Sequence, residues 1–185
     1  MRIISGKHQR RKITPPKNLP VRPTTDFAKE ALFNILRNRF SSYENYDVLD
    51  LYAGTGNISL EFASRGAKTV TSVDSNMKCI QFINKISEEL DLPIQTHRMN
   101  AEQYAANVNG TYDIIFADPP YHISDEDLQT LNELVYNNLL AEGGLFIIEH
   151  SKHALKKIEL PQEVDRRKYG GTIFTFIEKN KNAGL

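Results

Sequence analysis

The residues best suited to chemistry form a short corner in which an acid, two prolines and a tyrosine follow one another. They are Asp118, Pro119, Pro120 and Tyr121. Neither proline has an N–H and each fixes φ, and the proline after Asp118 holds that residue in an extended conformation. The Asp118 carboxylate and the Pro119 carbonyl can accept both N–H bonds of an exocyclic amine on a planar base, with Tyr121 stacked on the ring. A plain turn that closes a strand is the alternative, so a second site has to decide.

The segment before this corner, residues 114–117, is apolar without alternation. Such a run predicts a strand buried on both faces, as in a parallel sheet. Open α/β sheets bind their ligands outside the carboxyl ends of their strands. The corner is therefore predicted at a ligand-binding edge.

A pair of glycines, Gly54 and Gly56, follows another predicted strand. Glycines permit a tight turn here and let the backbone approach a ligand closely. The third glycine of a dinucleotide fingerprint is missing, because Ser59 holds its place. Asp50 lies inside the strand end, where a carboxylate can engage a cationic amino-acid group directly or through water.

Asp74 ends the next predicted strand, 18 residues after Gly56, where an acidic side chain accepts hydrogen bonds from ribose hydroxyls. Neither loop has the lysine of a phosphate-binding loop, so S-adenosylmethionine fits better than NAD. Asn100, after the third predicted strand, either reads the adenine edge or only forms a turn. The expected cofactor contacts are Asp50, Tyr52, Ala53, Gly54, Gly56, Asp74, Ser75, Asn100, Ala101 and Asp118.

Length and composition favour one globular domain with a small appendage, since the chain has 185 residues of which 40% are hydrophobic. No run approaches the roughly 20 apolar residues of a membrane span, and the first residues lack the apolar core of a signal peptide. The single cysteine, Cys79, allows no internal disulfide, and no Cys/His cluster has zinc spacing. We expect a cytoplasmic monomer without a metal.

The net charge of zero hides an asymmetry between the two ends of the chain. Residues 1–29 contain eight Lys and Arg residues and one Asp, a net charge of +7, so the remainder carries −7. A cationic arm on an acidic body indicates a polyanion partner such as nucleic acid, with a solvated tail as the alternative. The RNA-binding candidates are Arg10, Arg11, Lys12, Lys17, Arg22 and Thr24.

The arm is predicted over residues 1–23 and the main domain over residues 24–180. Weak alternation around Gly6 predicts a short hairpin in residues 1–14, with a basic tip, and four prolines in residues 14–23 predict an extended connector. Thr24 or Thr25 can cap the helix that follows. One apolar face of this helix is expected to comprise Phe27, Ala31, Leu32, Ile35, Leu36 and Phe40.

Strand and helix signals then alternate along the chain. Strands are predicted at residues 48–52, 69–73, 94–99, 114–117 and 145–149, and helices at residues 57–64, 77–90, 101–108 and 125–140. This order implies an α/β fold with a parallel doubly wound sheet. Residues 164–178 contain a Gly-Gly turn and predict a closing antiparallel hairpin, which makes seven strands in all.

Two motifs together resemble the Rossmann-like, class I S-adenosylmethionine-dependent methyltransferases that modify exocyclic amines. They are residues 50–56, Asp-Leu-Tyr-Ala-Gly-Thr-Gly, and the corner at residues 118–121. Residues 22–36, which begin Arg-Pro-Thr-Thr-Asp, are similar to the RsmD family, as are residues 65–67 and 168–170. That family methylates guanine N2 in bacterial 16S ribosomal RNA. The likeness covers nearly the whole chain, with departures at residues 57–59 and at Asn100.

The resemblance implies S-adenosylmethionine as the cofactor and 16S rRNA or the small-subunit particle as the partner. Transfer to the amine would depend mainly on positioning, with Asp118 and the Pro119 carbonyl holding the amine. Tyr121 would stack on a base swung out of its RNA, worth ~1–3 kcal/mol. The proton would leave to Asp118 or to water.

Other functions suit the same corner. Adenine N6 in DNA or RNA and a glutamine amide in a protein are possible acceptors, and a fold without activity would be an RNA-binding protein. The basic arm argues against a protein substrate, and the intact glycines and Asp118 argue against lost activity. His122 is interpreted as a solvated loop residue, and the pair Glu149 and His150 as structural.

Overall fold

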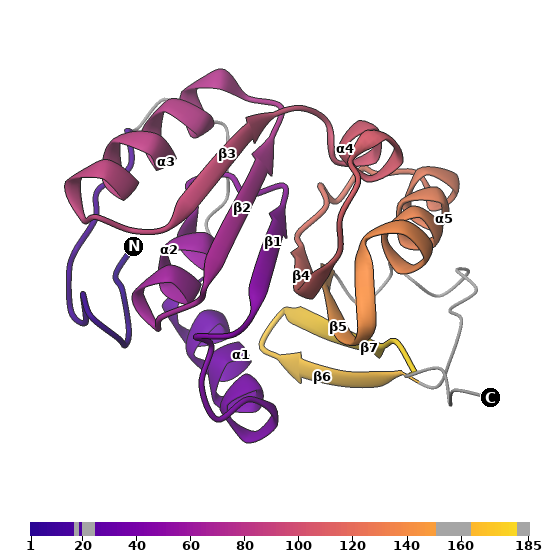
Figure 1. Ribbon diagram of the computed structural model, residues 1–185, viewed down its shortest axis with the longest axis horizontal. Coiled ribbons are helices and arrows are strands. Elements are labelled where there is room, and N and C mark those ends of the chain that lie inside the picture. The colour runs from indigo at the N-terminus through magenta and orange to yellow at the C-terminus, as the bar shows by residue number, and fades with distance from the viewer. Residues whose placement is uncertain (17–18, 20–24, 151–163, 181–185) are drawn as a thin grey trace.

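The computed structural model describes residues 1–16, 19, 25–150 and 164–180 (Figure 1). Seven strands form one sheet in the order β3-β2-β1-β4-β5-β7-β6. Five of them are parallel neighbours, whereas β7 runs antiparallel to both β5 and β6. The predicted mainly parallel sheet with a C-terminal antiparallel hairpin is therefore confirmed. The strands span β1 (Asp47–Leu51), β2 (Thr69–Asp74), β3 (Ile94–Arg98), β4 (Tyr112–Ala117), β5 (Leu140–His150), β6 (Asp165–Tyr169) and β7 (Thr172–Glu178).

Helices cover both faces of the sheet because each strand alternates its apolar side chains between two cores. One core joins Val48 and Ile114 to the helices α1, α2 and α3. The other joins Leu49 and Ile115 to α4 and α5. The helices span α1 (Asp26–Arg39), α2 (Asn57–Ser64), α3 (Met77–Glu89), α4 (Ala101–Asn107) and α5 (Asp125–Leu134). Strand order reverses between β1 and β4, and this switch point opens a crevice at their carboxyl ends.

The start of α1 differs in one respect from its predicted apolar face. Thr25 caps the helix, and its hydroxyl accepts the backbone N–H of Ala28 at 3.2 Å. Leu32 and Leu36 are fully buried, as the helical spacing predicts, but Phe27 is 67% exposed. Phe27 lies in the first turn, beyond the edge of the core that the later turns contact. Thr24, the other capping candidate, lies outside the described residues.

The helical segment predicted over residues 125–140 extends to Leu139 but changes type before its end. α5 stops at Leu134, and a π-helical turn, η1 (Val135–Leu139), leads directly into β5. The Lys179 ammonium donates to the carbonyls of Tyr136 and Leu140, both at 2.9 Å. These carbonyls lie at the end of the helical segment, where no further turn supplies donors. A side chain from beyond β7 thus stabilises an ending that local sequence does not reveal.

The N-terminal hairpin packs closely on the main domain. Ile3 and Ile13 are buried in the same core as α1 and α2, and the hairpin closes through one bridge between Arg2 and Lys12. Gly6 has φ 88°, and a Cβ at this position would lie 1.8 Å from the Ser64 carbonyl oxygen. Glycine therefore permits both the turn and the close approach to the end of α2.

A buried carboxylate fastens this hairpin to α1 and α2. Glu61 is fully buried, and it accepts the backbone N–H groups of Ile4 and Ser5 at 2.8 and 3.0 Å. The Lys29 ammonium lies 3.3 Å and the Arg65 guanidinium 2.7 Å from its oxygens. Burial lowers the pKa of Lys29, and the Glu61 charge opposes this shift. Such a group is stable only because every partner is in place.

Candidate active site

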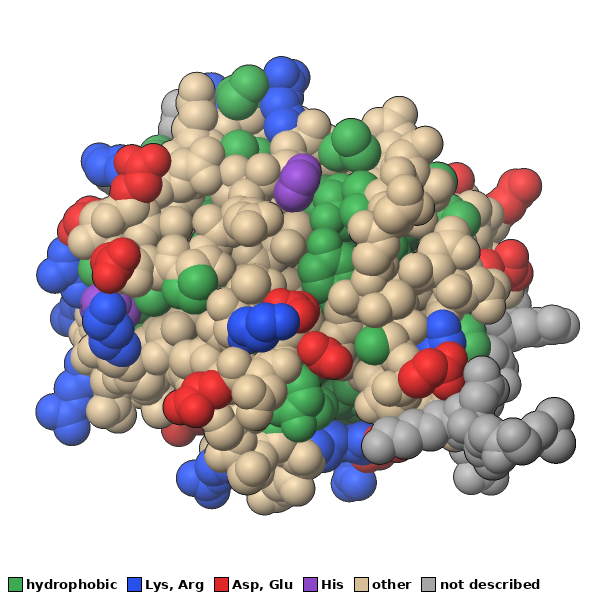
Figure 2. All heavy atoms as spheres, in the orientation of Figure 1, with side chains coloured by type: hydrophobic (Ala, Val, Ile, Leu, Met, Phe, Trp, Pro, Cys, Tyr) green, Lys and Arg blue, Asp and Glu red, His purple; other side chains and the backbone are tan. Residues whose placement is uncertain are grey.

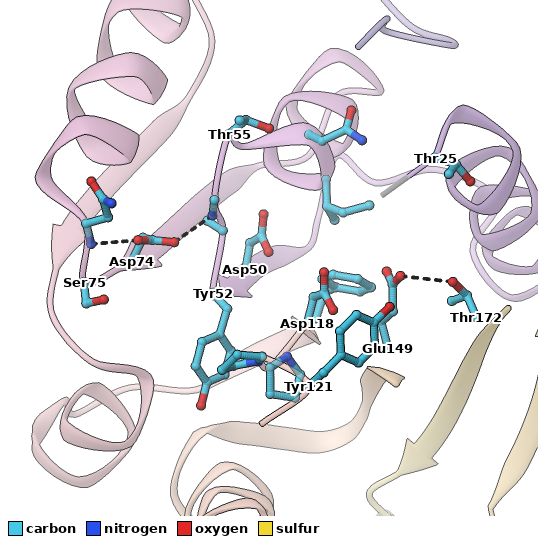
Figure 3. Close-up of a pocket in the computed structure, with 18 of the residues that line it drawn as sticks. Thr25, Asp50, Tyr52, Thr55, Asp74, Ser75, Asp118, Tyr121, Glu149 and Thr172 are labelled. Carbon is cyan, nitrogen blue, oxygen red and sulfur yellow. Dashed lines mark hydrogen bonds between the residues drawn. The ribbon is translucent and has the colours of Figure 1, made fainter. Parts of the chain in front are cut away.

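A cavity of about 490 Å³ lies at the carboxyl ends of the parallel strands (Figure 3). At one end of it lie Asp74 and Ser75, from the end of β2, together with Gly54 and Asn76, whose backbone N–H groups donate to Asp74. At the other end lie Thr25, Asp118, Tyr121, Glu149 and Thr172, from α1 and from the ends of β4, β5 and the start of β7. The sheet thus brings the predicted cofactor residues and the predicted base-binding corner to one cavity.

The glycine turn after β1 has the strained backbone that the sequence predicts. Tyr52 has φ 59° and Gly56 has φ 71°, both in the left-handed region. A Cβ on Gly56 would lie 2.8 Å from Ile83 of α3, so glycine is required twice over. The left-handed backbone conformation of Tyr52 is strained, and such strain is common at positions that line functional sites. The Tyr52 hydroxyl donates a hydrogen bond to Glu102 at 2.5 Å.

Asp74 holds the loops on both sides of it. Its carboxylate accepts the backbone N–H of Gly54 at 2.8 Å and that of Asn76 at 2.7 Å. Both loops line the cavity. A carboxylate has about four acceptor sites, so two such bonds leave capacity for ribose hydroxyls. Asp74 therefore shapes this end of the cavity and presents an acceptor to it.

Asp50 lies at the floor of the cavity and is only 1% exposed. Its carboxyl accepts the backbone N–H of Ser59 at 3.0 Å and also the Ser59 hydroxyl. Ser72 in turn donates to the Ser59 hydroxyl at 2.7 Å. Burial raises the pKa of Asp50 to about 7, against the hydrogen bonds from Ser59 and with help from the charge of Asp74. A cation placed beside Asp50 would be held by a carboxyl that ionises near neutral pH.

The proline corner continues directly from β4. The backbone N–H of Asp118 donates to the Leu51 carbonyl at 3.4 Å, and the N–H of Ile123 donates to the Pro120 carbonyl at 2.9 Å. These bonds close the chain into a turn at the cavity wall. The Tyr121 ring is 64% exposed, although Tyr121 lines the cavity. An exposed ring beside a cavity presents a stacking surface to a flat ligand.

Three predicted cofactor residues do not line the cavity. Gly56 is part of the turn after β1 but faces Ile83 of α3. Asn100 is exposed and precedes α4, without a side-chain hydrogen bond to the helix end. Ala101 is buried in the core between the sheet and α4. β3 pairs directly with β2 up to Arg98, opposite Asp74, yet the two residues that follow Met99 are outside the lining.

The residues predicted from the sequence did not include several that line the cavity: Thr25, Thr55, Asn57, Ile58, Asn76, Phe116, His122, Glu149 and Thr172. Glu149 is the most informative of these, because it was interpreted as structural. It ends an apolar strand, just as Asp74 does and just as Asp118 follows one, so the signal of an acid at a strand end was present. The Thr172 hydroxyl donates to Glu149 at 3.4 Å.

The basic candidates that the structure describes are not among the residues that line the cavity. Arg11 forms an ion pair with Glu89, the last residue of α3. That helix leaves the cavity edge after Asp74 and spans 13 residues, or ~20 Å at 1.5 Å per residue, so Arg11 lies near the opposite edge of the sheet. Arg10 and Lys12 are exposed. Lys17, Arg22 and Thr24 lie outside the described residues.

Comparison with known proteins gives consistent matches. The family model described as "Conserved hypothetical protein 95" matches residues 1–178. The "Ribosomal RNA small subunit methyltransferase D" of Buchnera aphidicola is 33% identical over 87% of this chain and 81% of its own length. The solved structure of yhhF from Escherichia coli superimposes with a TM-score of 0.84, at 26% identity over 98% of this chain and 99% of that one.

A more distant structure shares the fold. The Thermus thermophilus 16S rRNA N2 G1207 methyltransferase RsmC, solved with AdoMet and guanosine, superimposes with a TM-score of 0.72 at 23% identity. The match covers 88% of this chain and 45% of that chain. The class I methyltransferase fold predicted from the motifs is thereby confirmed.

Proposed function

This chain belongs to the RsmD family of methyltransferases, and we propose that it methylates the N2 amine of a guanine in 16S ribosomal RNA. One observation carries the proposal. The acceptor groups for an amine at Asp118 and Pro119 share a single cavity with the loops at Gly54 and Asp74. A donor of methyl groups and its acceptor have to meet in this way, because transfer needs their reacting atoms ~3 Å apart.

The residues at one end of the cavity fit S-adenosylmethionine. Asp74 offers acceptor oxygens for ribose hydroxyls, Asp50 offers a carboxyl for a cationic amino group, and Gly54 lets the backbone approach. Ser75, Tyr52 and Ala53 complete this end. The bound cofactor would supply a methyl group on a positively charged sulfur. Ser59 stands where a dinucleotide fingerprint has its third glycine, and no lysine is among the described residues that line the cavity; both features favour this cofactor over a dinucleotide.

The residues at the other end would orient the base. Asp118 and the Pro119 carbonyl would accept the two N–H bonds of the guanine amine, which favours a tetrahedral nitrogen with its lone pair directed into the cavity. Tyr121 would stack on the ring. The nitrogen lone pair forms the new N–C bond as the S–C bond breaks, and one amine proton leaves to Asp118 or to water.

The basic surfaces of the chain would hold the phosphates of the RNA. Arg10, Arg11 and Lys12 remain candidates for this role, together with Lys17, Arg22 and Thr24. The edge strand β6 adds Arg166, Arg167 and Lys168, all exposed. Within the residues that the structure describes, no helix is long and apolar enough to cross a membrane. No group of three His, Cys, Asp or Glu residues in the described ranges is arranged to hold a metal ion.

The proposal is tested by methyl transfer to a substrate that lacks the modification. Small-subunit particles from a strain without this gene are incubated with the purified protein and tritiated S-adenosylmethionine, and the rRNA is digested to nucleosides. We expect the label in N2-methylguanosine. Label in N6-methyladenosine, or in ribosomal protein, would assign the corner to another acceptor. No incorporation into either the particle or naked rRNA would contradict the proposal.

A further inference from the structure

Two acidic residues lie side by side at the carboxyl ends of the adjacent strands β4 and β5. β4 and β5 run parallel with Ala117 opposite Ile148, so Asp118 and Glu149 follow directly on neighbouring strands that lie ~4.8 Å apart. Both residues line the cavity, and Figure 3 shows them on the same side of it, next to Tyr121. A ring stacked on Tyr121 would therefore present one edge to both acids.

The Glu149 side chain is buried and held in place by a neighbouring strand. It is 7% exposed, and the Thr172 hydroxyl from the start of β7 donates to its Oε1 at 3.4 Å. Burying a carboxylate is costly unless it has hydrogen-bond donors. A hydrogen-bond donor from a third strand thus orients the Glu149 carboxyl at the wall of the cavity.

Acceptors side by side complement guanine and oppose adenine. Guanine carries donors at N1 and at the neighbouring N2 amine, whereas adenine carries a lone pair at N1 next to its amine. An ionised carboxylate offers acceptors only. We propose that Glu149 accepts the N1–H of the target guanine while Asp118 and Pro119 hold the N2 amine, an assignment that rests on the proposed function. Glu149 is then the residue that determines base specificity.

The analogue that removes this contact is 2-aminopurine. It keeps the reacting 2-amine but has a lone pair at N1 in place of the N–H and no carbonyl at C6, so the Glu149→Gln variant is needed to single out the N1 contact. A site built to hydrogen-bond a substrate rejects an analogue without the matching group by ~10⁴-fold or more. The Glu149→Gln variant should reverse much of this discrimination, because an amide supplies an N–H donor for the N1 lone pair.

The experiment measures single-turnover methylation of reconstituted small-subunit particles. Their rRNA carries either guanine or 2-aminopurine at the position that the wild-type protein methylates. We expect the wild type to prefer guanine on the order of 10⁴-fold, and Glu149→Gln to slow guanine while bringing the two bases within about tenfold. Glu178→Gln is the matched control, since Glu178 is at the far end of β7 and is exposed there; both its rates should equal those of the wild type.

The outcomes separate this inference from the proposed function. A wild type that leaves guanine unmethylated overturns both. Equal wild-type rates on the two bases overturn the Glu149 assignment alone, as does a Glu149→Gln variant that slows both bases by the same factor, which is the result of a structural role. If Glu149→Gln fails to fold, Thr172→Val removes the orienting donor instead, and an unchanged preference for guanine then overturns the assignment.

Discussion

The acidic residues at the strand ends of this protein differ in their hydrogen-bond partners and in their burial. Asp74 is bonded to two backbone N–H groups, and Asp50 is bonded to Ser59 in a nearly inaccessible position. Asp118 follows β4 in a corner stiffened by two prolines. Because their surroundings differ, the same carboxyl chemistry can shape a loop, attract a cation or orient an amine.

Asp118 is predicted to act mainly by orienting the amine. Asp118→Asn keeps one acceptor oxygen and should retain measurable turnover, whereas Asp118→Ala should lose nearly all of it. The attacking amine can lose its proton after methyl transfer, so the carboxylate need not accept it. Single-turnover methylation of small-subunit particles distinguishes the cases, because loss of general-base assistance would slow both variants by ~10²–10⁴-fold. Both variants should keep the wild-type affinity for the cofactor. If Asp118→Ala methylates at the wild-type rate, the proline corner is a structural turn without a catalytic role.

Asp50 is predicted to make cofactor affinity depend on pH. Its pKa in the folded protein is raised from 3.8 to about 7, so below pH 7 the carboxyl is mainly protonated. A bound cation favours the ionised form, and binding below pH 7 therefore releases a proton. Affinity for S-adenosylmethionine should rise with pH by up to ~10-fold per pH unit below 7 and level off above it.

Calorimetry in buffers of different ionisation enthalpy measures this proton release directly. Asp50→Asn is the matched variant, because it keeps the shape of the side chain and removes the titration. Its affinity should be weaker and should lose this dependence on pH. A wild type that binds the cofactor without releasing a proton below pH 7 would show that Asp50 is not beside the cationic group.

At the scale of elements, the hairpin and α2 form one structural unit. Gly6 contacts Ser64, the hairpin backbone bonds to Glu61, and the Thr55 hydroxyl at the cavity donates to the Met1 sulfur at 3.4 Å. Lys29 of α1 joins this unit through Asn57, another cavity residue, at 2.8 Å. Deleting the hairpin would therefore expose Glu61 and remove part of the core, so point substitutions are the better probe of its role.

Gly6→Ala is predicted to destabilise the protein by more than ~2 kcal/mol. The added Cβ meets a backbone carbonyl at 1.8 Å and the residue has φ 88°, so the hairpin has to move away from α2 or remain strained. Urea unfolding measures the change in free energy. Gly171→Ala is the control, since nothing lies within 4 Å of its Cβ, and it should stay within ~0.5 kcal/mol. Equal losses would mean that the docking of the hairpin contributes little.

At the scale of the whole molecule, the positive charge is divided between separate surfaces. Lys and Arg side chains gather near the N-terminal hairpin and α3, interspersed with acids, in the view of Figure 2. A second group, Arg166 and Lys168, lies on the edge strand β6, which turns directly into the cavity residue Thr172. Lys29, which the charge count of the arm includes, is buried against Glu61 and faces no partner molecule.

Both basic surfaces are predicted to contact phosphates. Two double variants, Arg10→Gln with Lys12→Gln and Arg166→Gln with Lys168→Gln, should each flatten the plot of log K against log salt by ~1.4, at ~0.7 per lost single-strand contact. Binding of an rRNA fragment at several salt concentrations measures the slope. Lys68→Gln, an exposed change at a lysine that pairs with Asp47 at the start of β1, should leave it unaltered. If the first double variant leaves the slope unchanged, Arg10 and Lys12 do not contact the phosphates of the RNA.

Local sequence patterns were sufficient to predict several strands and the position of the site. Residues 114–117 of β4 form a continuous apolar run, as is typical of strands buried on both faces, and β1, β2 and β4 were predicted to within a few residues. The glycine turn and the proline corner follow from the allowed backbone angles of single residues. Because ligands bind at the carboxyl ends of such strands, the cavity was predicted at the correct edge, with Asp50, Asp74 and Asp118 among its lining.

Contacts between residues distant in the chain could not be predicted from local patterns. Glu149 and Thr172 lie on strands whose pairing no local pattern reports, and Asn100 follows a strand end in the same way as Asp74 yet lies outside the cavity lining. Glu61 appears in the sequence as one more helical acid, but it is fully buried because the hairpin, Lys29 and Arg65 surround it. Burial and partnership are properties of the packed chain, because a side chain loses its water only when other elements displace that water.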